Sequence, residues 1–322
     1  MKVAINGFGR IGRAFFKLAT RHPDIQIVAI NDLASKESLE YLLKYDSIYG
    51  KFAGGLDGIQ FFGEQNPINL PWSSLDVDVV VEATGLFRTQ EKASAHIQAG
   101  AKRVVISAPS KDITTVLAGV NEEKLQTCQI SSNASCTTNA VSPVVGILDE
   151  AIGVESAILN TVHGYTATQS LVDSTTRGED MRRGRAAAVN IIPTSTGAAH
   201  ATTKAHEQLK DKFDGVALRV PVPAGSIADV TFIAKQSTSV EEVNEALKNA
   251  AESAKWKNIF AVTDEPLVST DILGIPKAAI TDLSMTRVVD GNLVKVLSWY
   301  DNEVGYASSL VQHVLSAGKG SN

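Results

Sequence analysis

The chain has 322 residues, of which 44% are hydrophobic and 20% are charged, which is typical of a globular protein with a sizeable core and two domains. A net charge of -5 argues against nucleic-acid or anionic-membrane surfaces, and no apolar stretch approaches the ~20 residues that span a bilayer. Only two cysteines occur, and no closely spaced cysteine or histidine pair offers a zinc site, so we expect a cytoplasmic protein without bound metal. The N-terminus runs directly into a predicted strand, with no signal-peptide layout.

The first third of the chain alternates short β-branched runs with longer helical patterns. This alternation predicts a parallel sheet built from right-handed crossovers. The predicted strands, buried on both faces, are 2–6, 25–31, 77–82 and 103–107, and the predicted helices are 13–22, 38–44 and 89–99.

The pattern changes from about Ser156, where longer strands appear. These features predict an α+β second domain with a mixed or antiparallel sheet. The predicted strands are 157–163, 215–220, 229–234 and 293–300, and the predicted helices are 197–209 and 240–255. We therefore expect one domain over residues 1–135 and another over 136–302. A terminal helix over about 303–322 is expected to pack back on the first domain.

A glycine-rich hexapeptide follows the first predicted strand: Gly7-Phe8-Gly9-Arg10-Ile11-Gly12. It fits G-x-G-x-x-G, with a strand before it, a helix after it, and Asp32 at the end of the next strand. The three glycines would permit a tight turn, close approach of a pyrophosphate and close helix packing, while Asp32 would bind the adenosine ribose. This context predicts a Rossmann-type doubly wound domain that binds NAD.

One cysteine lies among small polar residues. Cys136, between Ser135 and Thr137, begins a segment that reads as a helix. The N–H groups and dipole at a helix start lower a thiol's pKa, so the placement predicts a nucleophilic thiolate. A buried, inert cysteine is the alternative, and packing is the role expected of Cys128, which falls in an apparent strand.

A nucleophilic cysteine needs a base, and His163 is the best placed of six histidines because it ends a predicted strand and precedes a loop. We expect His22, His96 and His313 on helix surfaces. Arginines and hydroxyl groups further along are suited to anion binding, which favours a phosphorylated substrate; they are Arg182, Arg183, Arg185, Arg219 and the run Thr194-Ser195-Thr196-Gly197.

Five segments together resemble phosphorylating glyceraldehyde-3-phosphate dehydrogenase, in order and with matching spacing as far as about Tyr306. They are residues 6–13, 132–139, 185–188, 192–199 and 299–303. The resemblance implies a homotetramer that uses NAD, glyceraldehyde 3-phosphate and inorganic phosphate, with no nucleic-acid or membrane partner.

The resemblance also implies residue roles. Cys136 would attack the aldehyde and pass through a hemithioacetal and a thioester, with His163 as the base. Asn302 would orient the nicotinamide amide, with Tyr306 nearby, and Thr84 and Ser107 would meet the cofactor. Thr166 and Arg219 match the site for the substrate's phosphate; the attacking phosphate would be bound by Ser135, Thr137, Thr196, Gly197 and Arg183.

Some positions depart from the family pattern. Thr168 replaces an acid, Gln65 replaces an arginine near the adenine, and His200 replaces a lysine. Arg177, in an unusual loop over 173–180, leaves NADP use open, although Asp32 argues against it. Two other functions remain alternatives: an erythrose-4-phosphate dehydrogenase, which shares this cysteine chemistry, and a dinucleotide-sensing protein without catalysis.

Overall fold

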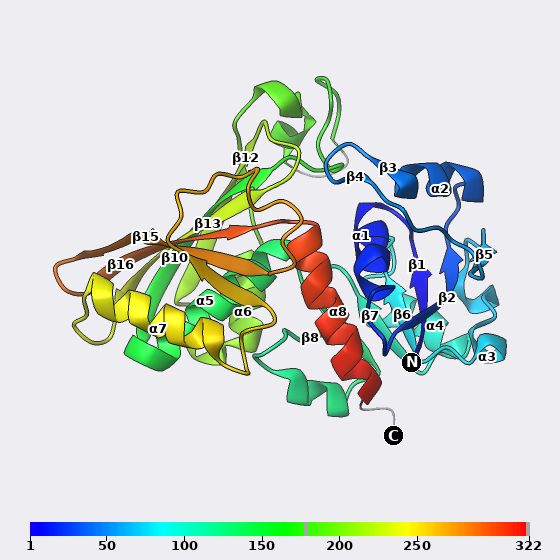
Figure 1. Cartoon of the computed structure of the whole chain (residues 1–322), viewed down its shortest axis with the longest axis horizontal. Helices are drawn as coiled ribbons and strands as arrows, with labels where there is room; N and C mark the ends of the chain where they lie inside the picture. The colour runs from blue at the N-terminus through cyan, green and yellow to red at the C-terminus, as the bar shows by residue number, and fades with distance from the viewer. Residues whose placement is uncertain (177–179, 320–322) are drawn as a thin grey trace. The chain divides into compact units, whose positions relative to one another are not determined.

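The computed structural model describes residues 1–176 and 180–319. The chain forms two compact units, whose elements are labelled in Figure 1. The first comprises Met1–Ser135 with the segment from Ala307, and the second is Cys136–Tyr306. Within the described residues, no helix combines the length and apolar character needed to cross a membrane.

The first unit is built on a seven-stranded sheet in which every neighbouring pair is parallel. The order is β5-β2-β1-β6-β7-β9-β8, so the chain winds outward from β1 in both directions. The predicted doubly wound α/β fold is confirmed. The strands are β1 (Lys2–Asn6), β2 (Gln26–Asn31), β5 (Gln60–Phe62), β6 (Val79–Glu82), β7 (Arg103–Ile106), β8 (Thr114–Thr115) and β9 (Ile130–Ser132).

Short helices and a hairpin complete this unit. They are α1 (Arg10–Ala19), α2 (Lys36–Lys44), η1 (Pro67–Asn69), α3 (Trp72–Leu75), α4 (Gln90–Gln98) and η2 (Glu122–Gln126), with strands β3 (Tyr45–Asp46) and β4 (Gly50–Lys51). Helix α1 begins three residues before the predicted start, directly after Gly9, and ends early enough that His22 lies beyond it. The early start places the helix N-terminus beside the glycine loop.

Two histidines predicted on surfaces are buried. His96 on α4 is 0% exposed and His313 on α8 (Val304–Lys319) is 1% exposed. Both rings are hydrogen-bonded: His96 to Trp72 and Glu82, and His313 to Ser131 and Asn133. The surface prediction was wrong because helical position alone does not show that these polar rings have buried partners.

Cys128 is also not in a strand. It lies between η2 and β9, is partly buried, and its thiol donates to the carbonyl of Lys124.

The second unit is built on a mixed seven-stranded sheet, as predicted, in the order β11-β12-β10-β13-β16-β15-β14. The pairs β10–β12 and β14–β15 are parallel and the others antiparallel. The strands are β10 (Val154–Gly164), β11 (Ile192–Ser195), β12 (Phe213–Val220), β13 (Ser226–Ala234), β14 (Phe260–Thr263), β15 (Ala279–Val289) and β16 (Leu293–Tyr300). The parallel pairing of β10 with β12 sets His163 directly beside Arg219.

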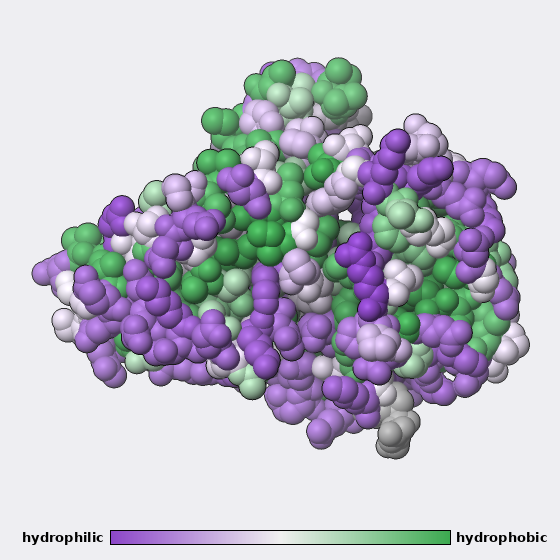
Figure 2. Space-filling view, viewed as in Figure 1, coloured by the Kyte–Doolittle hydropathy of each residue, from purple (hydrophilic) through white to green (hydrophobic). Residues whose placement is uncertain are grey.

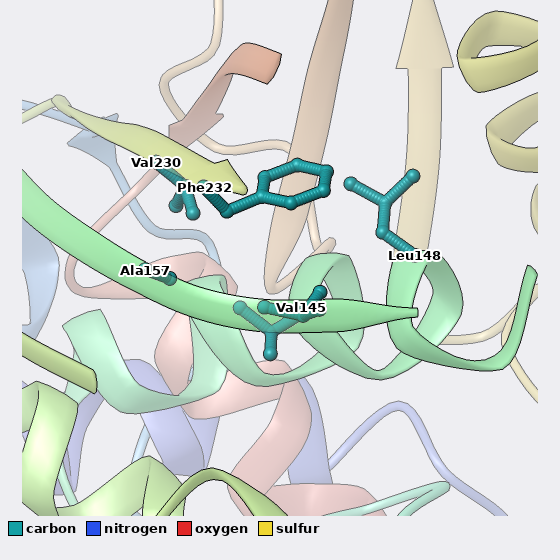
Figure 3. A pocket seen from close by; sticks show the side chains of 6 residues that line it. Val145, Leu148, Ala157, Val230 and Phe232 are labelled. Atoms are coloured by element: carbon teal, nitrogen blue, oxygen red, sulfur yellow. The ribbon is translucent and has the colours of Figure 1, made fainter. Parts of the chain in front are cut away.

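Helix α5 (Cys136–Ile152) packs against four strands of this sheet and against two neighbouring helices, α6 (Ala198–Ala205) and α7 (Val240–Glu252). Figure 3 shows Val145 and Leu148 of α5 beside Val230 and Phe232 of β13. The gap between these side chains has no room for a water molecule, so it is ordinary core packing.

Three short 3₁₀ helices complete the unit: η3 (Met181–Gly184), η4 (Ala187–Val189) and η5 (Glu207–Leu209). The helix predicted over 197–209 is therefore two pieces, interrupted at His206.

Candidate active site and cofactor pocket

The glycine loop after β1 is tightly packed where it must be and open where a ligand could approach. Gly7 has φ +93°, and a Cβ there would lie 2.6 Å from the Thr84 backbone nitrogen. A Cβ on Gly12 would lie 2.2 Å from the Gly7 carbonyl, whereas a Cβ on Gly9 would meet nothing within 4 Å. The loop thus offers bare backbone at the start of α1, where unpaired N–H groups favour a phosphate group.

A pocket opens beside this loop at the carboxyl ends of β1, β2 and β6. Four predicted cofactor residues line it: Gly7, Gly9, Asp32 and Thr84. Residues that the sequence reasoning missed line it too: Asn6, Asn31, Leu33, Glu64, Ala83, Leu86 and Phe87; Gln65, noted only as a departure, is a further member. Ligands bind at this edge of open parallel sheets, so the position suits a dinucleotide.

Asp32 connects the glycine loop to the end of β2. Its carboxylate accepts the Phe8 N–H at 2.7 Å through Oδ2 and the Ala34 N–H at 2.9 Å through Oδ1. A carboxylate has about four acceptor positions, so both oxygens can still accept ribose hydroxyl groups.

The other predicted cofactor residues in this unit do not line the pocket with their side chains. Phe8 is buried against Phe16, and Arg10 reaches Asp46 and the ring of Tyr49. Ile11 and Gly12 follow on α1, and Ser107 follows β7, where its N–H donates to the Glu82 carbonyl. The predicted Arg177 lies outside the described residues.

In the second unit, Cys136 is the first residue of α5 and faces His163 at the end of β10. Its Sγ lies 3.3 Å from Nε2 of His163. Two residues earlier, Ala134 adopts the left-handed φ of +53°, an uncommon conformation for alanine, in the turn that leads to the helix. A thiol within reach of an imidazole is the arrangement that nucleophilic catalysis requires.

The electrostatics differ from the sequence prediction. Burial raises the pKa of the Cys136 thiol, and this outweighs the Arg219 charge and the hydrogen bonds from Thr137 and from backbone N–H groups, which lower it. Burial and the Arg219 charge also lower the pKa of His163 to about 3. The predicted resting thiolate was wrong: the pair is a neutral thiol beside a neutral imidazole.

Arg219 contacts the far side of the same imidazole. Its Nη1 lies 2.7 Å from Nδ1 of His163 and 3.0 Å from the carbonyl oxygen of Gly164. Nδ1 also lies 2.6 Å from that carbonyl. Arg219 and a protonated Nδ1 therefore share one acceptor, and the position of the guanidinium decides where the imidazole proton lies.

Tyr300, which the sequence reasoning missed, supports this site from β16. Its buried hydroxyl group bonds to Thr137 at 2.9 Å and to Thr161 at 2.7 Å, and its ring packs edge-on against His163. Burial raises the Tyr300 pKa, so the hydroxyl group stays protonated. Only the strand's alternating burial could have indicated that this side chain points inward.

The predicted phosphate-binding residues of this unit fall into two groups. Arg183 donates from Nε to the Thr194 hydroxyl at 3.0 Å and from Nη2 to the Ser195 carbonyl. Thr196 and exposed Gly197 follow, where α6 begins. The Arg183 charge lowers the pKa of both His163 and Arg219, which places its guanidinium near them.

The remaining predicted residues lie around the start of β13 and the loop after β10. The Asn302 amide oxygen accepts from the Gly225 N–H at 3.0 Å and the Ser226 hydroxyl at 3.1 Å. Tyr306 is 3% exposed. The Thr166 hydroxyl bonds to that of Thr168, and Ser135 is partly exposed just before Cys136.

The sequence matches two related domain families. Residues 1–90 match the glyceraldehyde 3-phosphate dehydrogenase NAD binding domain, and residues 135–302 match the C-terminal domain of the same enzyme. Several curated proteins align over nearly the whole chain. The glyceraldehyde-3-phosphate dehydrogenase of Thermotoga maritima is 49% identical over 326 residues, covering 96% of this chain and 97% of that protein.

Two further relatives agree. Glyceraldehyde-3-phosphate dehydrogenase of Mycobacterium avium is 46% identical over 340 residues, covering 99% of both chains. Glyceraldehyde-3-phosphate dehydrogenase 2 of Streptomyces avermitilis is 45% identical over 334 residues, covering 99% of this chain and 98% of that protein. The chain belongs to the glyceraldehyde-3-phosphate dehydrogenase family of NAD-dependent oxidoreductases.

Proposed function

We propose that this family member oxidises D-glyceraldehyde 3-phosphate with NAD⁺ and adds inorganic phosphate to give 1,3-bisphosphoglycerate. The observation that carries the proposal is the 3.3 Å contact between Cys136 Sγ and His163 Nε2, with Arg219 beside the imidazole. In this proposal residues 1–135 bind the cofactor, residues 136–302 carry the chemistry, and the terminal helix belongs with the first domain.

The first step is addition of the Cys136 sulfur to the aldehyde carbon. The thiol proton passes to Nε2 of the neutral His163, and the carbonyl oxygen takes up a proton, giving a hemithioacetal. This requires the tautomer in which Nδ1 donates to the Gly164 carbonyl, which lies 2.6 Å away. The Cys136 backbone N–H and the imidazole stabilise the oxyanion that develops.

Oxidation and phosphorylation follow on the same sulfur. When bound, NAD⁺ supplies the hydride acceptor for the hemithioacetal carbon, and Nε2 of His163 takes the hydroxyl proton, leaving a thioester on Cys136. A phosphate oxygen then attacks the thioester carbon, the carbon–sulfur bond breaks, and the sulfur recovers its proton from His163. The product is an acyl phosphate.

The two phosphates need separate cationic sites. We assign the substrate's phosphate to Thr166 and Arg219, and the attacking phosphate to Thr137, Arg183 and the start of α6, with Ser135, Thr196 and Gly197. The crossing of Arg183 to the end of β11 supports the second assignment, because it brings a guanidinium to a helix start that also presents hydroxyl and N–H groups.

The cofactor pocket fits NAD. Gly9 leaves open backbone for the pyrophosphate, and Asp32 would accept hydrogen bonds from the ribose and repel a 2′-phosphate. Asn302 would present its amide to the nicotinamide, with Tyr306 close by. Gln65 lines this pocket, so the departure from an arginine bears directly on adenine binding.

A rate panel tests the proposed reaction. Wild-type protein is assayed with glyceraldehyde 3-phosphate and with erythrose 4-phosphate, each with and without inorganic phosphate. We expect preference for the three-carbon substrate and dependence on phosphate. Preference for the four-carbon sugar without phosphate dependence would make the chain an erythrose-4-phosphate dehydrogenase.

A single variant separates the enzyme from a dinucleotide sensor. Cys136→Ser should bind NAD with unchanged affinity in calorimetry and lose turnover by at least about 10³-fold, because a serine hydroxyl group is a poor nucleophile here. Wild-type protein that binds NAD but turns over neither aldehyde would support the sensor instead.

We also propose that the chain self-associates as a homotetramer. Large apolar side chains are exposed on the segment between β10 and β11 and on adjoining strands, and Figure 2 shows hydrophobic surface at the top of the view, where Figure 1 draws this segment. They are Leu171, Val172, Met181, Val189, Ile191, Ile158 and Val216. Light scattering should give about four times the chain mass, and Leu171→Asp with Met181→Asp should lower it.

A cytoplasmic location follows from the chemistry proposed here. The thiol of Cys136 has to stay reduced, and the only other cysteine, Cys128, is also free. A reducing compartment maintains both thiols. Fluorescence microscopy of a tagged chain would test this location.

A further inference from the structure

A buried polar cluster lies next to the cofactor pocket, outside the site described above. It joins the indole of Trp72 on α3, the imidazole of His96 on α4 and the carboxylate of Glu82 at the end of β6. All three side chains are at most 1% exposed. We call these three residues the relay. Buried polar groups of this kind are costly unless every partner is in place.

The hydrogen bonds of the relay run in one direction. Trp72 Nε1 can only donate, and it lies 3.0 Å from Nδ1 of His96, so Nδ1 carries the lone pair. The imidazole proton therefore lies on Nε2, which donates to Glu82 Oε2 at 3.1 Å. His96 is a neutral donor to the carboxylate and not its cationic partner.

Glu82 collects donors from both sides. Oε2 also accepts from Asn6 Nδ2 at 2.6 Å, and Oε1 accepts from the Thr84 backbone N–H at 2.8 Å and from the Thr84 hydroxyl group. The Thr84 hydroxyl oxygen in turn accepts the Leu86 N–H at 3.0 Å. The turn from Thr84 to Leu86 is thus folded around one buried carboxylate.

This turn is a wall of the cofactor pocket. Asn6, Thr84 and Leu86 all line it, whereas none of the relay residues does. The turn also sits against the glycine loop, because a Cβ on Gly7 would lie 2.6 Å from the Thr84 nitrogen. A shift of the turn by a few tenths of an ångström would therefore change the space left for the cofactor.

We propose that Trp72, His96 and Glu82 are positioning residues for NAD, which hold the Thr84–Leu86 turn in its binding conformation through hydrogen bonds alone. The proposal rests on the NAD-binding role proposed for this pocket. It predicts that cofactor affinity depends on a tryptophan and a histidine that do not reach the cofactor.

The test compares two substitutions of His96. His96→Leu removes the donor to Glu82 and the acceptor for Trp72, whereas the side-chain amide introduced by His96→Gln can still donate to the carboxylate. Loss of a hydrogen bond to a buried charge should weaken NAD binding about tenfold in His96→Leu, and His96→Gln should restore most of it. Calorimetric Kd values for NAD and for ADP-ribose report the effect without turnover.

The matched control is His313→Leu. It removes another buried, doubly hydrogen-bonded histidine of the same unit that does not line the pocket and whose printed partners are not relay residues. The control should lower the melting temperature and leave the Kd for NAD unchanged. In steady state, His96→Leu should raise KM for NAD while kcat and KM for the aldehyde change little.

Trp72→Phe provides a second route if His96→Leu does not fold. Phenylalanine keeps the aromatic packing and removes only the N–H donor, so we expect a Kd for NAD about threefold higher. Equal affinities for NAD in wild type, His96→Leu and Trp72→Phe, or equal weakening in His313→Leu, would overturn the relay. Wild-type protein that binds no NAD would instead overturn the cofactor role of the pocket.

Discussion

Arg219 Nη1 lies 2.7 Å from Nδ1 of His163, on the side of the imidazole opposite the thiol of Cys136. Because a guanidinium only donates, this contact places the imidazole proton on Nε2, where it prevents acceptance of the thiol proton. When Arg219 donates instead to the Gly164 carbonyl, 3.0 Å away, Nδ1 can be protonated and Nε2 can act as a base. Binding of the substrate's phosphate to Arg219 would thus favour the competent tautomer.

The first prediction concerns the substrate's phosphate. In Arg219→Leu, kcat/KM for glyceraldehyde 3-phosphate should fall at least about 100-fold, because a charged contact is lost. For unphosphorylated glyceraldehyde the loss should stay below about tenfold, since that substrate never uses the guanidinium. Steady-state kinetics on both aldehydes make the comparison. Equal losses would place Arg219 in the chemical step and not in phosphate recognition.

The second prediction concerns the thiol. Because burial raises the pKa of Cys136, a thiol predominates at neutral pH, and only its small thiolate fraction reacts with iodoacetamide. Without NAD or phosphate, the alkylation rate of a Cys128→Ala variant should rise about tenfold per pH unit between pH 7 and 9. A rate independent of pH across this range would reveal a preformed thiolate.

A companion measurement tests His163 as the base. His163→Gln keeps an amide near the thiol but cannot take up its proton, so kcat should fall about 10²- to 10⁴-fold. The neutral His163 contributes no imidazolium to the resting thiol, so the alkylation profile against pH should change little. Undiminished turnover in this variant would remove His163 from the mechanism.

The third prediction concerns cofactor choice. Asp32→Asn keeps an acceptor for backbone N–H groups but removes the charge, so the NAD-to-NADP ratio of kcat/KM should fall about tenfold. Asp32→Ala should relax the ratio as well and also weaken NAD binding, because the glycine loop loses its partner. If the ratio stayed the same in both variants, Asp32 would not face the ribose.

The fourth prediction concerns stability against pH. Burial lowers the pKa of His313 to about 3, whereas the unfolded chain has the ordinary value of 6.5. Between these values the unfolded chain binds the extra proton, so the unfolding free energy falls as pH drops, by about 1.4 kcal/mol per unit. Above pH 6.5 the contribution is complete.

Urea unfolding at pH 7.5, 6 and 5 measures this slope. A Trp256→Phe, Trp299→Phe background leaves Trp72 to report on the first unit alone. His313→Gln should be less stable at pH 7.5 but show a shallower dependence on pH, since glutamine does not titrate. Parallel slopes in the two proteins would show that His313 is not the titrating group.

The sequence by itself determined the parallel α/β unit, the glycine loop with Asp32, the placement of Cys136 at a helix start and the family. These features depend on local periodicity, on turn chemistry and on short motifs, all of which are written in consecutive residues. The start of α1 and the break at His206 were harder to predict, because helix ends depend on a few competing hydrogen bonds.

Only the tertiary structure decided the electrostatics. The β10–β12 register sets Arg219 beside His163, and enclosure of Cys136 reverses the expected direction of its pKa. Burial of His96 and His313 depends likewise on partners far along the chain. Desolvation and cross-strand contacts arise from residues distant in sequence, so no local pattern could have shown them.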